Sequence, residues 1–183
     1  MSQKYKFSVQ DGTYFVTSTV VGWTDVFTRD LYRKKLLESF SFAQKEMGLI
    51  INAWVLMTNH FHMICSAPGG NLGSIFRRIK SFTGRELVEE IRNNIQESRK
   101  EHLISILRNF RTKKSNYGSQ YQFWRHENHP IYLSDVKMMW QKLNYIHLNP
   151  VRAGYVNLPE HWVYSSARDY MGEKGLLEIV HLF

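Results

Sequence analysis

The sequence predicts an α+β fold: a ferredoxin-like or RRM-like antiparallel sheet with helices packed on one face. Segments rich in β-branched and aromatic residues alternate with segments whose apolar residues recur every three or four positions. The 183 residues suit one domain, and the sequence has no internal repeat and no Pro/Gly/Ser-rich linker. We therefore expect residues 1–183 to form a single domain. It should include a basic connection at about 101–120 and a C-terminal tail at about 151–183.

Four segments are predicted to be strands by their β-branched and aromatic content. They cover residues 13–21, 49–57, 60–66 and 121–124. Only Thr58-Asn59 separates the second from the third, which is the length of a tight hairpin turn. These two segments are therefore expected to form a β-hairpin.

Two helices are predicted to alternate with these strands. The first is capped by Thr28 or Asp30 and ends near Met47, where Gly48 supplies the glycine that commonly follows a helix. The second opens at Asn71. Its expected apolar side consists of Leu72, Ile75, Phe76, Ile79 and Phe82. Beyond it, residues 101–120 are predicted to be irregular and basic, with Arg108, Arg111, Lys113 and Lys114.

A third helix is expected from Asp135 to Leu148, with Ser134 as its cap. Pro150 should end it, because the residue before a proline disfavours helical geometry. Its predicted core stripe is Val136, Met139, Trp140 and Leu143. Tyr145 is turned away from that stripe, and Asn149 shares its face because residues four apart are neighbours on a helix. On the helix alone, the pattern favours a tyrosine packed on a neighbouring element, with Asn149 capping the helix end before Pro150.

Composition narrows the class of protein. The net charge of +8 and the pI near 9.6 favour a polyanionic partner, most often nucleic acid. The single cysteine, Cys65, permits no intrachain disulfide, lies in an apolar run and suggests a reducing, cytoplasmic setting. No stretch reaches the roughly 20 apolar residues of a membrane span. A buried structural thiol and no membrane partner are therefore expected.

The strongest local signal for chemistry is His60-Phe61-His62. Residues two apart on a strand project to the same face, so the two imidazoles lie side by side, just after a turn. Phe61 should point the other way, into the core. Two adjacent imidazoles make half of a metal site, although ordinary hydrogen-bonded histidines show the same spacing.

Basic residues occur in two groups that could contact phosphates. One group lies on the second helix, and the other flanks the tyrosine region. The groups are Arg77, Arg78, Lys80 and Arg85, and Arg125, Lys142 and Arg152.

Together, these motifs resemble a known family. His60-Phe61-His62 follows the strand INAWVLMTN, and YIHLNPVRAGYV comes much later, at 145–156. The pair is similar to that of the REP-associated tyrosine transposases, relatives of the single-tyrosine HUH transposases of insertion sequences. The resemblance covers about residues 13–170 and includes Phe123-Trp124 and WVYSSA at 162–167.

The resemblance implies specific roles. His60, His62 and Asn149 would bind a divalent cation, Mg²⁺ or Mn²⁺, and Tyr145 would be the nucleophile. Attack on single-stranded, hairpin-forming repeat DNA would give a 5′-phosphotyrosine link and a free 3′-OH, which a second 3′-OH can reverse without ATP. Asn149 replaces the longer Gln of the wider family, and full transposases there are homodimers that exchange the tyrosine helix.

Two other functions are compatible with the sequence. One is a non-catalytic, RRM-like module that binds single-stranded nucleic acid by stacking bases on an open sheet. The RNP signature of such modules is absent, and they do not explain the His-Phe-His motif. The other is a metal hydrolase that activates water, in which Tyr145 is structural.

Overall fold

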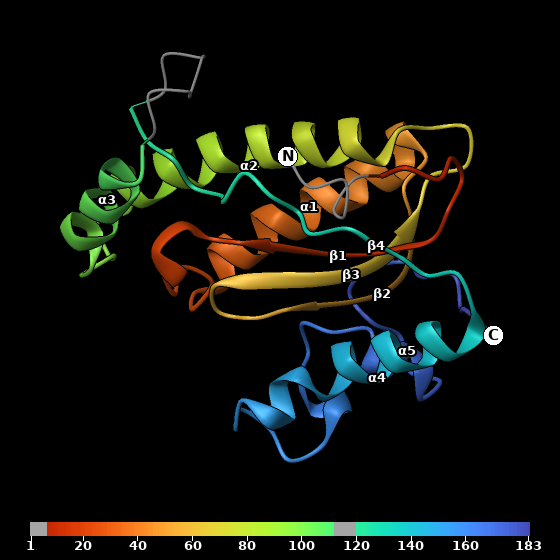
Figure 1. Cartoon of the computed structure of the whole chain (residues 1–183). Helices are drawn as coiled ribbons and strands as arrows, with labels where there is room; N and C mark the ends of the chain where they lie inside the picture. The colour runs from red at the N-terminus through yellow and green to blue at the C-terminus, as the bar shows by residue number, and fades with distance from the viewer. Residues whose placement is uncertain (1–6, 112–119) are drawn as a thin grey trace.

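The structure is a computed structural model that describes residues 7–111 and 120–183. Its strands are β1 (Tyr14–Thr19), β2 (Ile50–Leu56), β3 (His60–Ser66) and β4 (Ile131–Tyr132). The α-helices are α1 (Asp30–Met47), α2 (Leu72–Asn93), α3 (Lys100–Asn109), α4 (Val136–Arg152) and α5 (Ala167–Tyr170), and the 3-10 turns are η2 (Val21–Trp23) and η3 (Pro159–His161). The strands form one antiparallel sheet in the order β2-β3-β1-β4. Helices α1 and α2 lie together on one side of this sheet (Figure 1). The predicted α+β class is confirmed.

The predicted hairpin is present and forms one side of the sheet, with β2 at the edge and β3 next to β1. Strands β2 and β3 pair across the turn 58–59, where the Met57 N–H donates to the His60 carbonyl over 2.8 Å. The strand predicted at 121–124 is wrong, since Trp124 makes only an isolated bridge with Val20. Its ring is buried against Phe27 instead, at a centroid distance of 5.7 Å, and β4 provides the fourth strand.

The larger core lies between the sheet and helices α1 and α2. Phe61 and Cys65 of β3 point into it, as the two-residue alternation predicts, and burial raises the pKa of the Cys65 thiol. The Asn71 side chain accepts a hydrogen bond from the Ser74 N–H and caps α2 as expected. Phe82 was predicted to belong to this core, but it is 51% exposed.

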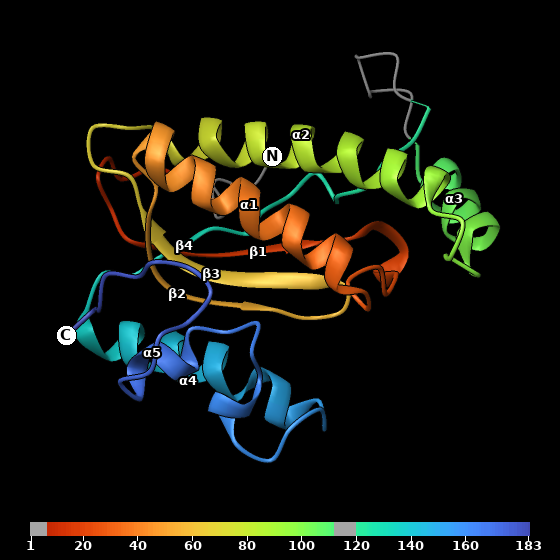
Figure 2. The same ribbon diagram turned by 180° about the vertical axis from the view of Figure 1, so that it is seen from behind.

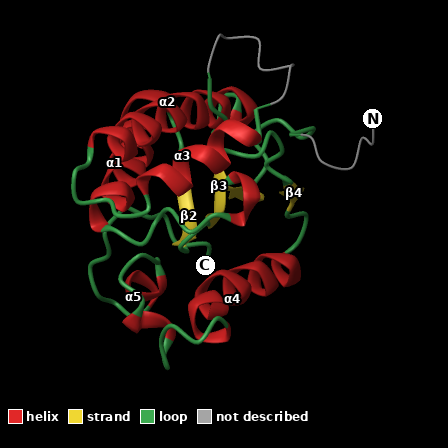
Figure 3. Ribbon diagram, turned by 90° about the vertical axis from the view of Figure 1, so that its left-hand side faces the viewer, coloured by secondary structure: helices red, strands yellow, loops and turns green. Residues whose placement is uncertain are grey.

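Helix α4 covers the opposite face of the sheet (Figure 3), so the prediction that the helices pack on one face holds for α1 and α2 but not for α4. Of its predicted core stripe, Leu143 is buried, but Val136 and Trp140 are exposed. The observed buried face is Leu143, Ile146 and Pro150. Pro150 does not end the helix, which continues to Arg152. A proline is tolerated there because it removes only one hydrogen bond, close to the end of the helix.

The predicted irregular connection at 101–120 is wrong in its first half. Residues 100–109 form α3, whose Leu103, Ile104 and Leu107 are buried against the main core. These apolar residues have helical spacing, which the basic residues around them obscured. Lys113 and Lys114 lie outside the described residues.

The C-terminal segment protects the free edge of β2. Its Val180 N–H donates to the Ile51 carbonyl, and the Asn52 side chain donates to the Val180 carbonyl. Figure 2 shows this segment crossing beside β2. Upstream, the Leu56 N–H donates to the Tyr164 carbonyl. Covering an edge strand in this way removes a site for unwanted pairing.

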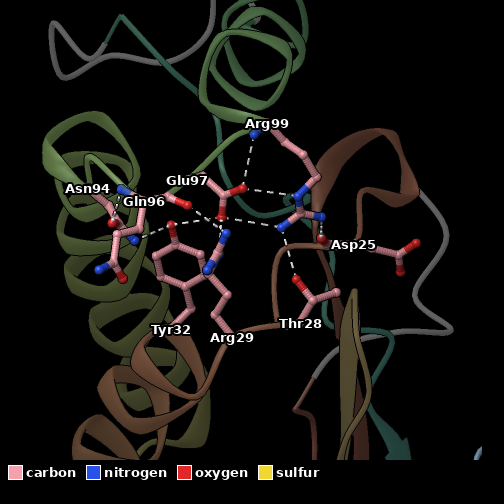
Figure 4. Close-up of polar contacts among 8 residues, drawn as sticks. All are labelled: Asp25, Thr28, Arg29, Tyr32, Asn94, Gln96, Glu97 and Arg99. Carbon is pink, nitrogen blue, oxygen red and sulfur yellow. Dashed lines mark hydrogen bonds and ion pairs between the residues drawn. The ribbon is translucent and has the colours of Figure 1, made fainter.

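A buried carboxylate ties α2 and α3 to the loop before α1 (Figure 4). The side chain of Glu97 is fully buried and accepts hydrogen bonds from Arg29, Tyr32 and Arg99. Arg99 also donates to the Asp25 carbonyl over 2.8 Å. Burial opposes the charge, but the hydrogen bonds from Arg99 and Arg29 outweigh it and lower the pKa of Glu97 to about 2.

This cluster predicts how stability depends on pH. The folded-state pKa of Glu97 lies below its ordinary value of 4.5, so its contribution is present above pH 4.5 and is lost as pH falls towards 2. Glu97→Gln should lower the free energy of unfolding at pH 7 by about 1–3 kcal/mol. The free energy of unfolding of this variant should also fall less steeply than that of the parent protein as pH drops from 4.5 towards 2. Urea unfolding at several pH values measures both effects, and equal acid sensitivity in the two proteins would contradict the assignment.

Candidate active site

The two histidines lie on the sheet face that α4 covers. In the strand register, His62 is opposite Thr17 and His60 is opposite Thr19 of β1. Both histidines are almost fully buried, and their ring centroids are 4.8 Å apart. The side-by-side arrangement predicted from the sequence is therefore present.

One nitrogen of each imidazole already has a partner. The Nδ1 atom of His60 lies 2.6 Å from Asn59 Oδ1, and the Nδ1 atom of His62 lies 2.7 Å from Thr17 Oγ1. Among residues 7–111 and 120–183, neither Nε2 atom has a hydrogen-bond partner. Histidine ligands commonly bind a metal through one nitrogen while the other is held by a protein group. The Nε2 atoms are thus the available ligands.

The surroundings keep both imidazoles neutral. Burial lowers the pKa of His60 to about 4, although the nearby Asp25 carboxylate opposes this effect. Burial lowers the pKa of His62 to about 3, and the charge that His60 carries when protonated and the charge of Lys142 act in the same direction. A metal binds the neutral form of imidazole, so both groups are in the binding-competent state at neutral pH.

The distance between the two rings would allow one divalent cation to bind both. A metal about 2.1 Å from each Nε2 atom lies roughly 3.2 Å from each ring centre, so two rings 4.8 Å apart can share it. Within the described part of the chain, no cluster of three or more His, Cys, Asp and Glu side chains is present. Two imidazoles leave coordination positions for an amide, water or phosphate oxygens, which suits Mg²⁺ or Mn²⁺.

Helix α4 brings Tyr145 to the histidines. The Tyr145 ring is half-buried and lies edge-on to His62, with 5.0 Å between ring centroids. It also packs against Phe15 of β1, at 5.8 Å. Asn149 lies one turn further along α4 and is half-buried, and its side chain makes no hydrogen bond with any described residue.

Several neighbours of this centre could not be identified from the sequence. Thr17 reaches His62 only through long-range strand pairing, and Trp23 stacks on His60 from the turn after β1. Asp25 accepts a hydrogen bond from Thr58 of the hairpin turn. Of these neighbours, only Asn59 could have been suspected from the sequence, because it directly precedes His60 in the turn.

The basic residues predicted to bind DNA do not form one surface. Lys142 lies beside Tyr145, with its ammonium nitrogen 5.7 Å from the ring centroid, and Arg125 faces Trp23. Arg152 is exposed at the end of α4. The exposed residues Arg77, Arg78 and Arg85 lie on α2, across the sheet from Tyr145 (Figure 3).

Lys80 has a different environment from the other predicted contacts. Its ammonium group donates to the carbonyls of Arg125, His126 and Glu127 and to the Asn128 side chain. Burial lowers its pKa to about 8, although Glu127 opposes this effect. Lys80 thus holds the loop that carries Arg125, and its donors are not free for phosphate.

Comparison with known proteins identifies the family. Residues 10–107 match the family model described as "Transposase IS200 like", which is more than half of the chain. The chain belongs to the IS200-like transposase family. The resemblance inferred from its motifs is thereby confirmed. Transposases cut and rejoin DNA, so membership of the family implies DNA as the substrate.

The fold is similar to a solved structure of the same kind. A structure described as the REP-associated tyrosine transposase bound to a REP hairpin matches with a TM-score of 0.65 and 19% sequence identity. The match covers 100% of this chain and 94% of the other. A comparison with curated proteins found no match. The family match includes His60 and His62 but ends before Tyr145.

An RRM-like module needs an open sheet face for base stacking, but here α4 covers the face that carries Phe15 and His62. Of the helices in residues 7–111 and 120–183, none has the length and hydrophobicity needed to cross a bilayer.

The histidine pair predicts a specific pattern of metal binding. His60→Ala and His62→Ala should each abolish Mn²⁺ binding, measured by calorimetry without DNA. Asn59→Ala and Thr17→Ala should weaken Mn²⁺ binding by about 10- to 100-fold, because each removes the hydrogen bond that holds one imidazole ring in its orientation. The exposed His161→Ala serves as the control and should bind like the parent protein. Full Mn²⁺ affinity in both histidine variants would place the metal elsewhere.

Proposed function

We propose that this chain is a metal-dependent endonuclease and strand transferase that acts on single-stranded DNA through Tyr145. The main support is the arrangement on the covered sheet face, where the Tyr145 ring lies 5.0 Å from His62 and His62 lies 4.8 Å from His60. A metal-binding pair and an adjacent hydroxyl are the two parts that the reaction needs. The described residues would act as one catalytic domain.

A divalent cation held by His60 and His62 would neutralise the scissile phosphate and polarise its phosphorus. Asn149 is proposed as the third ligand because it lies one helical turn from Tyr145. The protein's own part is to hold a dry site of fixed geometry. Phe15 packs beside both Tyr145 and His62 and restricts the positions that either ring can take.

The covalent step is a transesterification. The Tyr145 oxygen bonds to phosphorus while the bond from phosphorus to the 3′ oxygen breaks. The phenolic proton is lost to solvent, and the leaving 3′ oxygen takes up a proton to give a 3′-OH. The product is a 5′-phosphotyrosine, and attack by another 3′-OH reverses the step and restores the phenol. Bond energy is thus conserved, as strand transfer requires.

Lys142 is proposed to bind a phosphate next to the reacting one. Its ammonium group lies 4.8 Å from the Phe15 ring centroid and 5.7 Å from that of Tyr145. Arg125 and Arg152 would extend this basic surface, whereas Arg77, Arg78 and Arg85 would contact DNA that passes beyond the sheet. Contacts of this kind give affinity without sequence readout.

Hairpin-forming repeat DNA is the proposed substrate. The similar solved structure is described as bound to a REP hairpin, and the two chains align over almost their whole lengths. In this chain α4 packs on its own sheet, so Tyr145 and the histidines would act within one chain. The homodimer expected from the wider family stays a prediction.

Tyr145→Phe tests the proposed nucleophile. The variant removes one hydroxyl and keeps the ring that packs on Phe15 and His62, so fold and DNA binding should be retained. With labelled hairpin DNA and Mn²⁺, the parent protein should give a covalent adduct on a denaturing gel, and the variant should give none. Tyr155→Phe is the matched control, because Tyr155 is exposed and its hydroxyl lies near the hairpin turn.

The possible outcomes separate the competing mechanisms. An adduct in Tyr145→Phe would mean that another residue is the nucleophile. Cleavage without an adduct would favour a metal hydrolase that activates water. Binding without any cleavage by the parent protein would favour a non-catalytic binding module.

A further inference from the structure

A tryptophan at the edge of the histidine pair has an unusual conformation. Trp23 has a φ of 56°, and its side chain is 56% exposed. A bulky residue with positive φ is a conformational outlier that persists only where its surroundings impose it. Such residues concentrate at binding and catalytic sites.

The turn that carries Trp23 is held from two sides. Gly22 has a φ of 64°, and a Cβ atom there would lie 2.9 Å from the Phe110 ring and 3.0 Å from Ile106. The end of α3 therefore packs directly on this turn. The Trp23 N–H donates to the Val20 carbonyl. The position of the indole is thus set by the fold rather than by contacts of the indole alone.

The indole is also coupled to the histidine pair. It stacks on the His60 ring with 5.1 Å between centroids and 25° between planes. Asn59 joins the two residues, because its Oδ1 atom pairs with His60 Nδ1 while its Nδ2 atom donates to the Trp23 carbonyl. One buried side chain thereby orients an imidazole and the backbone of Trp23 together.

Arg125 places a cation near the same indole. The Arg125 guanidinium carbon lies 6.0 Å from the Trp23 ring centroid, at the outer limit of a cation–π contact. Two hydrogen bonds hold the backbone of Arg125: its N–H donates to the Thr19 carbonyl, and its carbonyl accepts from Lys80. The side chain itself is exposed and free to contact a ligand.

We propose that Trp23 and Arg125 form a subsite for one unpaired nucleotide next to the reacting phosphate. The nucleobase stacks on the indole, and Arg125 binds a phosphate of the same nucleotide. An exposed aromatic surface with a nearby cation matches these two parts of a nucleotide. The proposal rests on the proposed function, because it assumes that single-stranded DNA enters the site.

A fluorescent base analogue tests the subsite without cleavage. A series of hairpin oligonucleotides, each with 2-aminopurine at a different unpaired position, is mixed with the protein in the absence of metal. At one position, the parent protein should quench the fluorescence strongly. Trp23→Phe should preserve most of this quenching, and Trp23→Gly should abolish it.

Trp23→Gly also separates a binding role from a structural one. Glycine adopts a positive φ at no steric cost, so the variant should keep its melting temperature. Its DNA affinity should fall by about 5- to 150-fold, the range measured for one base stacked on an aromatic side chain. Its Mn²⁺ affinity should stay unchanged. Trp140→Ala is the matched control, because Trp140 is also half exposed but stacks on Phe183, and it should bind DNA normally.

Three results would overturn the subsite: unchanged DNA affinity in Trp23→Gly, an equal loss of Mn²⁺ and DNA affinity, or no DNA binding by the parent protein. The second would mean that Trp23 only supports His60. Position-specific quenching without any covalent adduct would support the subsite while counting against the catalytic proposal. The two proposals can therefore fail separately.

Discussion

The alternation of side chains along β3 is the constraint on which the rest of this structure depends. β3 pairs with β1 on one side and β2 on the other, so none of its residues faces solvent at a sheet edge. Phe61 anchors the core under α1 and α2, while His60 and His62 are directed to the opposite face. A one-residue slip in register would exchange these two sets and lose both the core and the site.

Burial on that sheet face lowers the pKa values of His60 and His62. α4 excludes water from them, which keeps them uncharged at neutral pH, and Thr17 and Asn59 hold one nitrogen of each ring. The same covering helix carries Tyr145. A single packing interaction, α4 against β2 and β3, thus creates both the dry environment and the tyrosine beside it.

Local patterns in the sequence predicted the parts of the fold that depend on local physics. The two-residue period of β3, the cap at Asn71 and the glycine after α1 are of this kind. The predictions failed where a distant segment decides the outcome. Trp140 was assigned to the core because of its helical spacing, but it stacks on Phe183 at the end of the chain.

In the candidate site, too, the sequence predicted the residues that depend on local spacing but not those brought in by distant segments. The spacing of His60 and His62 and the pair of Tyr145 and Asn149 on one helix face were visible in the sequence. Thr17 and Trp23 were not, because only sheet pairing and the packing of α3 bring them there. The predicted DNA contacts were separated by topology, since the sheet divides the α2 arginines from Lys142.

The most direct test is a crystal of the protein soaked with Mn²⁺, measured at an X-ray wavelength where manganese scatters anomalously. The account predicts one strong anomalous peak shared by the Nε2 atoms of His60 and His62, on the α4 side of the sheet. A peak that touches neither histidine, or none at Mn²⁺ concentrations that support DNA cleavage, would contradict it.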